Sequence, residues 1–508
     1  MKNNNKKGFV NEKYLEKQRE AIIERIQRYD NKLYLEFGGK LLFDYHAARV
    51  LPGYNPNVKM RLLQNLKEKA EIILCIYAGD IERKKLRADF GITYDVDAQK
   101  LIDDIREWGL EVTGVVITRY EKQISADIFK NKLEHRGIKV YTHRRTPGYP
   151  TDIDLIVSDQ GYGVNQYIPT EKPLVIITGP GPGSGKLATC LSQMYHDHKA
   201  GRRSGYAKFE TFPIWDLPLK HPVNLAYEAA TADIGDFNLI DPFHLETYQE
   251  SAVNYNRDVE VFPVLRRILT KLTSETDFYK SPTDMGINRV SYGIVDDNVI
   301  RNAAKQEIIR RYFRYKYEYV MGFVDKDTVE RSELLMEELN IKPEDREVVI
   351  PARLAAEEAR MQQAKGNEGI FCGASLELPD GTVVTGKNSP LLHASSSLFL
   401  NAIKKMAGIP HEVTLLPEEI IESVANLKKD VMQMKSLSLD LEETLISLSI
   451  GAAANSTIKK ALSQVKELRG CEMHMTHVPT PGDEAGLKRL GVNLTCDPNF
   501  SSKNLFSF

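Results

Sequence analysis

The chain has 508 residues, 42% of them hydrophobic and 27% charged, and a formal net charge of -2 at pH 7. A chain of this length is longer than a single hydrophobic core usually supports, so we expect more than one domain. A nearly neutral chain argues against a broad surface for polyanions, and nucleic acid is therefore not an expected partner.

Strands and helices alternate along the first part of the chain. An amphipathic helix is expected over 11–30 and two short strands within 33–44. Further apolar strands, separated by helices such as 97–109 and 125–137, are expected at 71–80, 110–120, 138–144, 152–159, 173–179 and 205–214. This order predicts an α/β fold with a mostly parallel, doubly wound sheet and helices on both faces.

Long helical segments replace this pattern after about residue 222, at 258–272, 298–322 and 326–340. A hairpin over 370–390, with Asp380-Gly381 at its turn, and a strand at 471–478 follow. We therefore divide the chain into an α/β domain (1–235), a helical domain (236–350) and a small α+β C-terminal domain (351–508).

The location of the protein is expected to be cytoplasmic. The N-terminal segment lacks the apolar core of a secretory signal, and no apolar run approaches the roughly 20 residues that cross a bilayer. The five cysteines are far apart in the sequence and form no C-x-x-C pair, as in reduced proteins without a disulfide or zinc framework.

The segment "PLVIITGPGPGSGKLATC" (173–190) is the main candidate site, because it reads as a strand, a glycine-rich loop and a helix. Backbone N–H groups of such a loop can surround a phosphate, and a lysine at the helix start can reach its oxygens. "PGSGK" resembles the corresponding loop of nucleotide monophosphate kinases. The candidate cofactor-binding residues are Gly181, Gly183, Ser184, Gly185, Lys186 and Thr189.

Two positions depart from the phosphate-loop pattern. Pro180 occupies the first glycine position, and Leu187 replaces the Ser or Thr that binds Mg²⁺. Thr189 is the next hydroxyl, but two residues along a helix rotate it by about 200°. Whether a metal is used is therefore open. A plain strand-to-helix turn is the structural alternative.

The same residues also fit a dinucleotide-binding turn, G-x-G-x-x-A, with Glu210 at the end of the next strand as a ribose ligand. Loops that follow parallel strands are where α/β sheets place ligands. Glu210, Asp241 and His244 are therefore the candidate catalytic residues, since carboxylates and an imidazole can act as general acids and bases. The alternative for Asp241 is a helix cap before Pro242.

A second anion site is expected in the C-terminal region, where the hairpin end precedes a helix that begins with serines. The positive end of that helix, with nearby cationic and hydroxyl groups, could hold an anion. Its candidate residues are Lys387, His393, Ser395 and Ser396. Helix capping by the serines is the structural alternative.

Several motifs, among them "VSDQGYG", "VIITGPGPGSGKLATCLSQMYHDHKAG", "IDPFHLE", "VNYNRDVEVFPVL" and "HASSSLFLNAIKKMAG", resemble those of one family over essentially the whole chain. It is a family of bacterial proteins of roughly 500 residues known as a domain of unknown function, some labelled "ATP-dependent peptidase". The resemblance implies an α/β region, a helical insertion and a small α+β region, and a fold does not by itself imply an activity. No H-E-x-x-H or G-x-S-x-G motif supports a peptidase.

The leading expectation is an enzyme that binds a nucleotide such as ATP, or another phosphorylated small molecule, at residues 181–186. An NAD(P)-dependent oxidoreductase and a non-catalytic binding or scaffold protein are the alternatives. We expect no membrane partner. We expect the protein to form a homo-oligomer.

Overall fold

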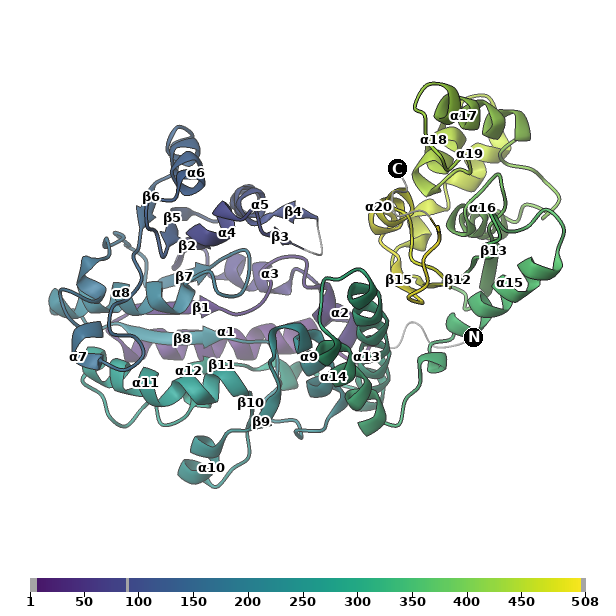
Figure 1. Ribbon diagram of the computed structural model, residues 1–508. Coiled ribbons are helices and arrows are strands. Elements are labelled where there is room, and N and C mark those ends of the chain that lie inside the picture. Colours follow the sequence, from purple (N-terminus) through teal and green to yellow (C-terminus); the bar gives the residue numbers. More distant parts are fainter. Residues whose placement is uncertain (1–6, 88–90, 504–508) are drawn as a thin grey trace. The chain divides into compact units, whose positions relative to one another are not determined.

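The computed structural model describes residues 7–87 and 91–503, which form two compact units (Figure 1). One unit comprises residues 7–304 and the other begins at residue 305. This division differs from the three segments expected from the sequence, because part of the 236–350 segment lies in each unit.

The first unit is built on a seven-stranded sheet in the order β11-β8-β1-β7-β2-β5-β6, in which each pair of neighbours is parallel. The predicted parallel α/β sheet is thus confirmed. Its strands are β1 (Leu33–Phe37), β2 (Ala70–Tyr77), β5 (Val112–Thr118), β6 (Val140–Thr142), β7 (Leu174–Thr178), β8 (Gly205–Phe209) and β11 (Gly286–Ile287). Two small antiparallel pairs accompany it, β3 (Leu86–Arg87) with β4 (Ile92–Thr93), and β9 (Asn238–Ile240) with β10 (Val253–Tyr255).

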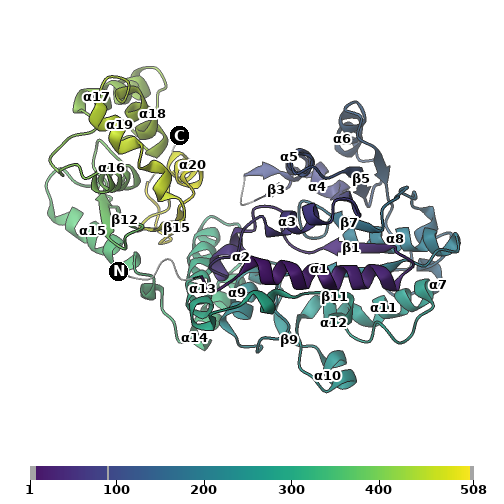
Figure 2. The same ribbon diagram turned by 180° about the vertical axis from the view of Figure 1, so that it is seen from behind.

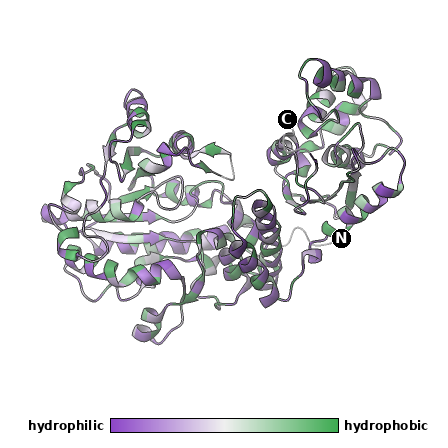
Figure 3. Cartoon of the chain, viewed as in Figure 1, coloured by the Kyte–Doolittle hydropathy of each residue, from purple (hydrophilic) through white to green (hydrophobic). Residues whose placement is uncertain are grey.

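Helices cover the sheet because their apolar sides need a partner surface. Hydrophilic and hydrophobic residues alternate along these helices (Figure 3). The helices are α1 (Asn11–Arg28), α2 (Tyr45–Val50), α3 (Val58–Asn65), α4 (Ala78–Glu82), α5 (Tyr94–Glu107), α6 (Ile124–Glu134), α7 (Ile153–Ile156), α8 (Lys186–Lys199), α9 (Pro222–Ala230), α10 (Pro242–Tyr248), α11 (Asn256–Thr273), α12 (Pro282–Met285) and α13 (Asp297–Val320), which continues past residue 304. Figure 2 shows α1 running along the sheet. One core joins β1, β2 and β7 to α8 and α11.

Strand β7 is central and buried along its whole length, between β1 and β2. From β7 the chain crosses β1 to reach β8, whereas from β2 it goes to β5 on the other side. Connections that leave neighbouring strands in opposite directions open a crevice at the carboxyl ends of those strands, where open α/β sheets bind ligands. The glycine-rich loop follows β7 at this position.

Two predicted strands are absent from the described structure of this unit. Residues 153–156 form the short helix α7, because the Asp152 carboxylate accepts a hydrogen bond from the Leu155 N–H at 2.9 Å. In 33–44 only β1 forms. Since β1 is flanked by parallel strands on both sides, it does not pair with a return strand.

The second unit contains a four-stranded mixed sheet in the order β13-β12-β14-β15. Strands β12 (Gly373–Glu377) and β13 (Val383–Lys387) form the predicted hairpin, and β14 (Glu472–Met475) and β15 (Asn493–Cys496) are parallel. Its helices after α13 are α14 (Lys326–Glu338), α15 (Val349–Met361), α16 (Ala394–Met406), α17 (Glu418–Asp430), α18 (Leu441–Gly451), α19 (Ser456–Leu462) and α20 (Pro481–Leu490). The expected α+β character is confirmed.

Candidate functional site

The glycine-rich loop occupies residues 179–185, between the end of β7 and the start of α8. Gly185, which precedes the helix, has a φ of 90°, a conformation that favours glycine. A Cβ at this position would lie 2.7 Å from the side chain of Thr118. The loop therefore needs glycine here both for its backbone conformation and for its close approach to the end of β5.

Among the residues that the structure describes, the backbone N–H groups of Gly181, Gly183 and Gly185 donate to no acceptor, while Ser184 closes a turn that begins at Gly181. The first N–H groups of a helix also have no partner within the helix, and they carry partial positive charge. The Lys186 Nζ lies 3.3 Å from the Gly181 carbonyl oxygen and 3.4 Å from the Ser184 Oγ. Unpaired amides and an ammonium group thus occur together in this loop.

Two residues at the end of β5 donate hydrogen bonds to carbonyl groups of the loop. The Thr118 hydroxyl donates to the Ser184 carbonyl at 2.7 Å, and the Arg119 guanidinium donates to the Gly183 carbonyl. The same guanidinium lies 3.4 Å from the ring centroid of Tyr77, at the end of β2. Sequence analysis missed Thr118 and Arg119. Their position at the carboxyl end of the predicted strand 110–120 was the available signal.

Thr189 does not face the loop opening. Its hydroxyl donates to the Gly185 carbonyl at 3.0 Å and lies 3.4 Å from the Cys75 sulfur. The side chain is fully buried. The rotation expected along the helix therefore places Thr189 inside the protein.

Glu210 follows β8 at the same carboxyl edge and belongs to a buried charged cluster. The Lys208 Nζ lies 2.8 Å from a Glu210 oxygen and 2.5 Å from the Asp258 Oδ2, and it also contacts the Tyr255 hydroxyl. Burial raises the pKa of Glu210 to about 7, and Lys208, which favours the charged form, offsets only part of this effect. A carboxyl group with such a pKa can exchange protons near neutral pH.

Glu36 connects the two parts of this edge. It lies on β1, between β7 and β8, where it is in register with Ile177 and Lys208. Its carboxylate is buried and accepts a hydrogen bond from the Tyr206 hydroxyl at 2.8 Å. Polar groups thus continue across the carboxyl edge from the glycine-rich loop to Glu210.

Asp241 and His244 have structural partners. Asp241 is buried; one oxygen accepts from the N–H groups of Phe243 and His244, and the other from the N–H and hydroxyl of Thr283. His244 Nδ1 lies 3.2 Å from the Ser281 hydroxyl. Asp241 thus caps α10 and ties it to α12.

The anion pocket expected at the start of α16 contains a carboxylate of the chain itself. Asp483 Oδ2 lies 2.7 Å from His393 Nδ1, and Asp483 Oδ1 accepts from the Ser395 hydroxyl at 2.5 Å. Burial alone would raise the pKa of Asp483, but His393, Ser395 and Thr480 outweigh burial and lower it. Sequence analysis named His393 and Ser395 but not Asp483, because its position 88 residues after Ser395 carries no local signal.

The other two residues of that set have different contacts. The Ser396 hydroxyl donates to the Leu439 carbonyl at 3.1 Å. The Lys387 Nζ lies 2.7 Å from a Glu358 oxygen and 3.3 Å from the Gln362 side-chain oxygen. Lys387 therefore pairs with α15.

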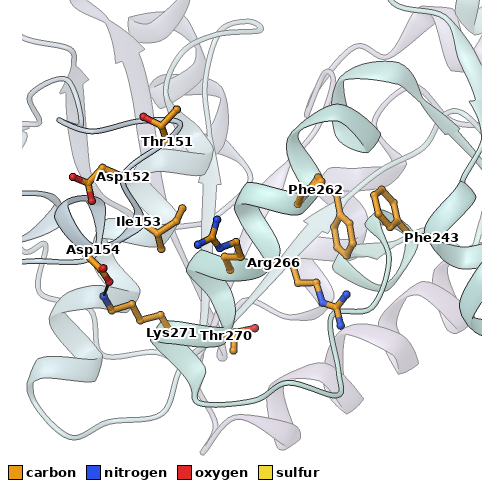
Figure 4. Close-up of a pocket in the computed structure, with 11 residues that line it drawn as sticks. Thr151, Asp152, Ile153, Asp154, Phe243, Phe262, Arg266, Thr270 and Lys271 are labelled. Atoms are coloured by element: carbon orange, nitrogen blue, oxygen red, sulfur yellow. Dashed lines mark hydrogen bonds and ion pairs between the residues drawn. The ribbon is translucent and has the colours of Figure 1, made fainter.

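A cavity of about 800 Å³ lies between α7 and α11 in the first unit (Figure 4). Phe243 and Phe262 provide apolar surface, while Lys271 pairs with Asp154 at 2.5 Å. No residue of the glycine-rich loop lines it. Within residues 7–87 and 91–503, no three His, Cys, Asp or Glu side chains are grouped to hold a metal ion.

Fold and site together define an α/β protein with a strand, a glycine-rich loop and a helix at the carboxyl edge of a parallel sheet. Two family models match the chain, "Domain of unknown function DUF1846, N-terminal" over residues 7–340 and its C-terminal counterpart over 344–506. The chain belongs to this family.

Its relatives include the "UPF0371 protein" of Clostridium botulinum (strain Langeland), 56% identical over 500 residues, which are 98% of this chain and 99% of the relative. The "UPF0371 protein" of Clostridium tetani (strain Massachusetts / E88) is 54% identical, with the same shares covered. The resemblance inferred from the motifs is confirmed, and these names carry no activity. No helix within the described ranges is both long and apolar enough to span a bilayer.

Proposed function

We propose that this protein is an enzyme that binds the phosphate of a nucleotide or of another phosphorylated small molecule in residues 179–186. The observation that carries the proposal is the set of unpaired loop amides beside Lys186. Backbone N–H groups at a helix start, with a lysine, are a recurrent way to bind phosphate. The position at the crevice beside β2 adds support.

Glu210 is the group for which we propose proton transfer. It lies on the same edge as the loop, and its pKa of about 7 suits a general acid or base. We propose no such role for Asp241 or His244, because their hydrogen-bond partners explain their positions as parts of a helix cap and its contacts.

The dinucleotide alternative has weaker support. An acidic ribose ligand normally ends the strand that follows the glycine turn and lies next to it. Here β1 separates β7 from β8, and Glu210 is paired with Lys208. We favour a phosphate ester such as a nucleotide over NAD(P). A cytoplasmic location, consistent with five free buried cysteines, is part of the proposal.

Isothermal titration of ATP, GTP, NAD and NADP into the wild-type protein and Lys186→Ala tests the proposal. We expect at least one phosphate compound to bind the wild type and to lose about tenfold or more in affinity with the variant. Binding to neither protein, or equal binding to both, would favour the non-catalytic scaffold and reject the proposal.

A further inference from the structure

Two cationic side chains point to the glycine-rich loop, and one of them, Lys186, follows the loop directly at the start of α8. The other is Arg119, at the end of β5. We propose that Arg119 binds the ligand's phosphate together with Lys186, so that the site takes a phosphate or diphosphate group without Mg²⁺. This inference rests on the proposed function, because it assigns the ligand's charge state and metal requirement at the same site.

The loop offers no hydroxyl of the kind that holds Mg²⁺ in phosphate loops. Leu187 stands at the position of the usual Ser or Thr. Thr189, the next hydroxyl, is buried and donates to the Gly185 carbonyl. The negative charge of a phosphate would therefore need another partner on this side of the loop.

Arg119 is placed to be that partner. In the strand order, β2 lies between β7 and β5, yet Arg119 reaches the Gly183 carbonyl and Thr118 reaches that of Ser184. The loop therefore extends over the end of β2 and meets the end of β5. Lys186 and Arg119 each donate to a carbonyl of this one loop.

The guanidinium is held in a defined orientation. It lies over the Tyr77 ring, and Gly79 permits this ring position, because a Cβ there would lie 2.5 Å from the ring. The Arg119 backbone has a φ of 49°, which is uncommon for a residue other than glycine and is found at ligand sites. A planar guanidinium has five N–H donors and fits phosphate oxygens in pairs.

The charges of Arg119 and Lys186 have no ion-pair partner in the part of the chain that the structure describes. No carboxylate among the described residues lies within ion-pair distance of either Arg119 or Lys186. Glu36, on the neighbouring strand, is buried and bonded to Tyr206. A dianionic phosphate group would match the two free positive charges, with charge-assisted hydrogen bonds in place of two bonds to carbonyls.

A purely structural role, in which Arg119 only fastens the loop to β5, gives a different expectation. In that case Arg119→Met would lower stability, while phosphate affinity would still depend on Mg²⁺. Titration of pyrophosphate into the full-length chain, once with Mg²⁺ and once with EDTA, separates the two roles. The variants are Arg119→Met, Arg119→Lys and, as a matched control, Arg145→Met, an exposed arginine that follows β6.

We expect wild-type affinity in EDTA to stay within about threefold of that in Mg²⁺. Arg119→Met should weaken binding in EDTA by about tenfold or more, with Arg119→Lys intermediate and Arg145→Met unchanged. Wild-type binding that requires Mg²⁺ and does not respond to Arg119→Met would overturn the inference and leave the proposed function standing. If pyrophosphate binds neither wild type nor variants, or binds Lys186→Ala equally well, the proposed function itself fails.

Discussion

His393 and the buried Asp483 form a pair in the second unit, with 2.7 Å between the His393 Nδ1 and the Asp483 Oδ2. The pair joins the start of α16 to the first turn of α20. Ser395, Thr480 and the Leu441 N–H also bond to this carboxylate. Two of the residues expected to bind an anion, His393 and Ser395, thus contact a carboxylate of the chain itself.

Asp483→Asn should therefore destabilise the second unit strongly. The substitution removes the charge that faces His393 and leaves buried donors without full partners, which costs about 3–5 kcal/mol for a broken buried pair. Urea unfolding, together with hydrogen exchange at α16 and α20, measures this loss of stability. Glu442→Gln, which breaks the exposed pair with Arg489, serves as control and should cost less than about 1 kcal/mol. Equal effects of the two variants would contradict this account.

The same pair predicts a pH dependence. Burial would lower the pKa of His393, but Asp483 outweighs burial and raises it. The stabilisation is therefore complete below the ordinary histidine pKa of about 6.5 and is lost as the pH rises through the folded-state value. Asp483 has a lowered pKa, so its contribution is lost only in acid. In His393→Gln the loss of stability above about pH 6.5 should disappear; an unchanged pH profile would exclude the pair as its cause.

Glu210 should make stability depend on pH in the opposite direction to a carboxylate with a lowered pKa. Its pKa is raised, so its neutral form is favoured by folding, and stability is lost as the pH rises from about 4.5 toward 7. Glu210→Gln should reduce this loss. Difference infrared spectra should show a protonated carboxyl band that titrates near pH 7 and is missing in the variant. A band that has already vanished at pH 5 would show that the group is an ordinary carboxylate.

Gly185 and Gly183 form a matched pair for a stability test. Both have positive φ, but a Cβ at Gly185 meets Thr118 at 2.7 Å, whereas nothing lies within 4 Å of one at Gly183. Gly183→Ala should cost about 1–2 kcal/mol for the backbone alone. Gly185→Ala should cost about 1–3 kcal/mol more because of overpacking. Similar unfolding free energies for the two variants would mean that the loop does not approach β5 as described.

Local sequence patterns predicted the parallel sheet well, because its strands are apolar runs separated by helices. Residues 152–159 were predicted as a strand because they are also apolar, but the Asp152 cap favours a helical turn. The hairpin with Asp380-Gly381 was recognisable because Asp-Gly in a short turn carries its own signal; here the turn has three residues, between Leu378 and Thr382. The order of strands in the sheet has no local sequence signal, so the place of β1 between β7 and β8 was not predictable.

For the site, the loop residues were identified because their signal is contiguous. Arg119, Lys208 and Asp483 act through partners 64, 50 and 88 residues away, respectively. Such pairings are decided by the packing of distant elements. Conversely, Asp241 has the motif of an acid/base residue, but its carboxylate is used by the backbone of α10 and by Thr283.

The central claim is that the amides of the glycine-rich loop bind phosphate oxygens. Amide proton and nitrogen shifts of a protein labelled with ¹⁵N-glycine and ¹⁵N-serine, titrated with pyrophosphate, test it most directly. The account predicts saturable shifts of Gly181, Gly183, Ser184 and Gly185 that are abolished by Lys186→Ala. Resonances of these four residues that stay in place while others move, or that move equally in the variant, would contradict it.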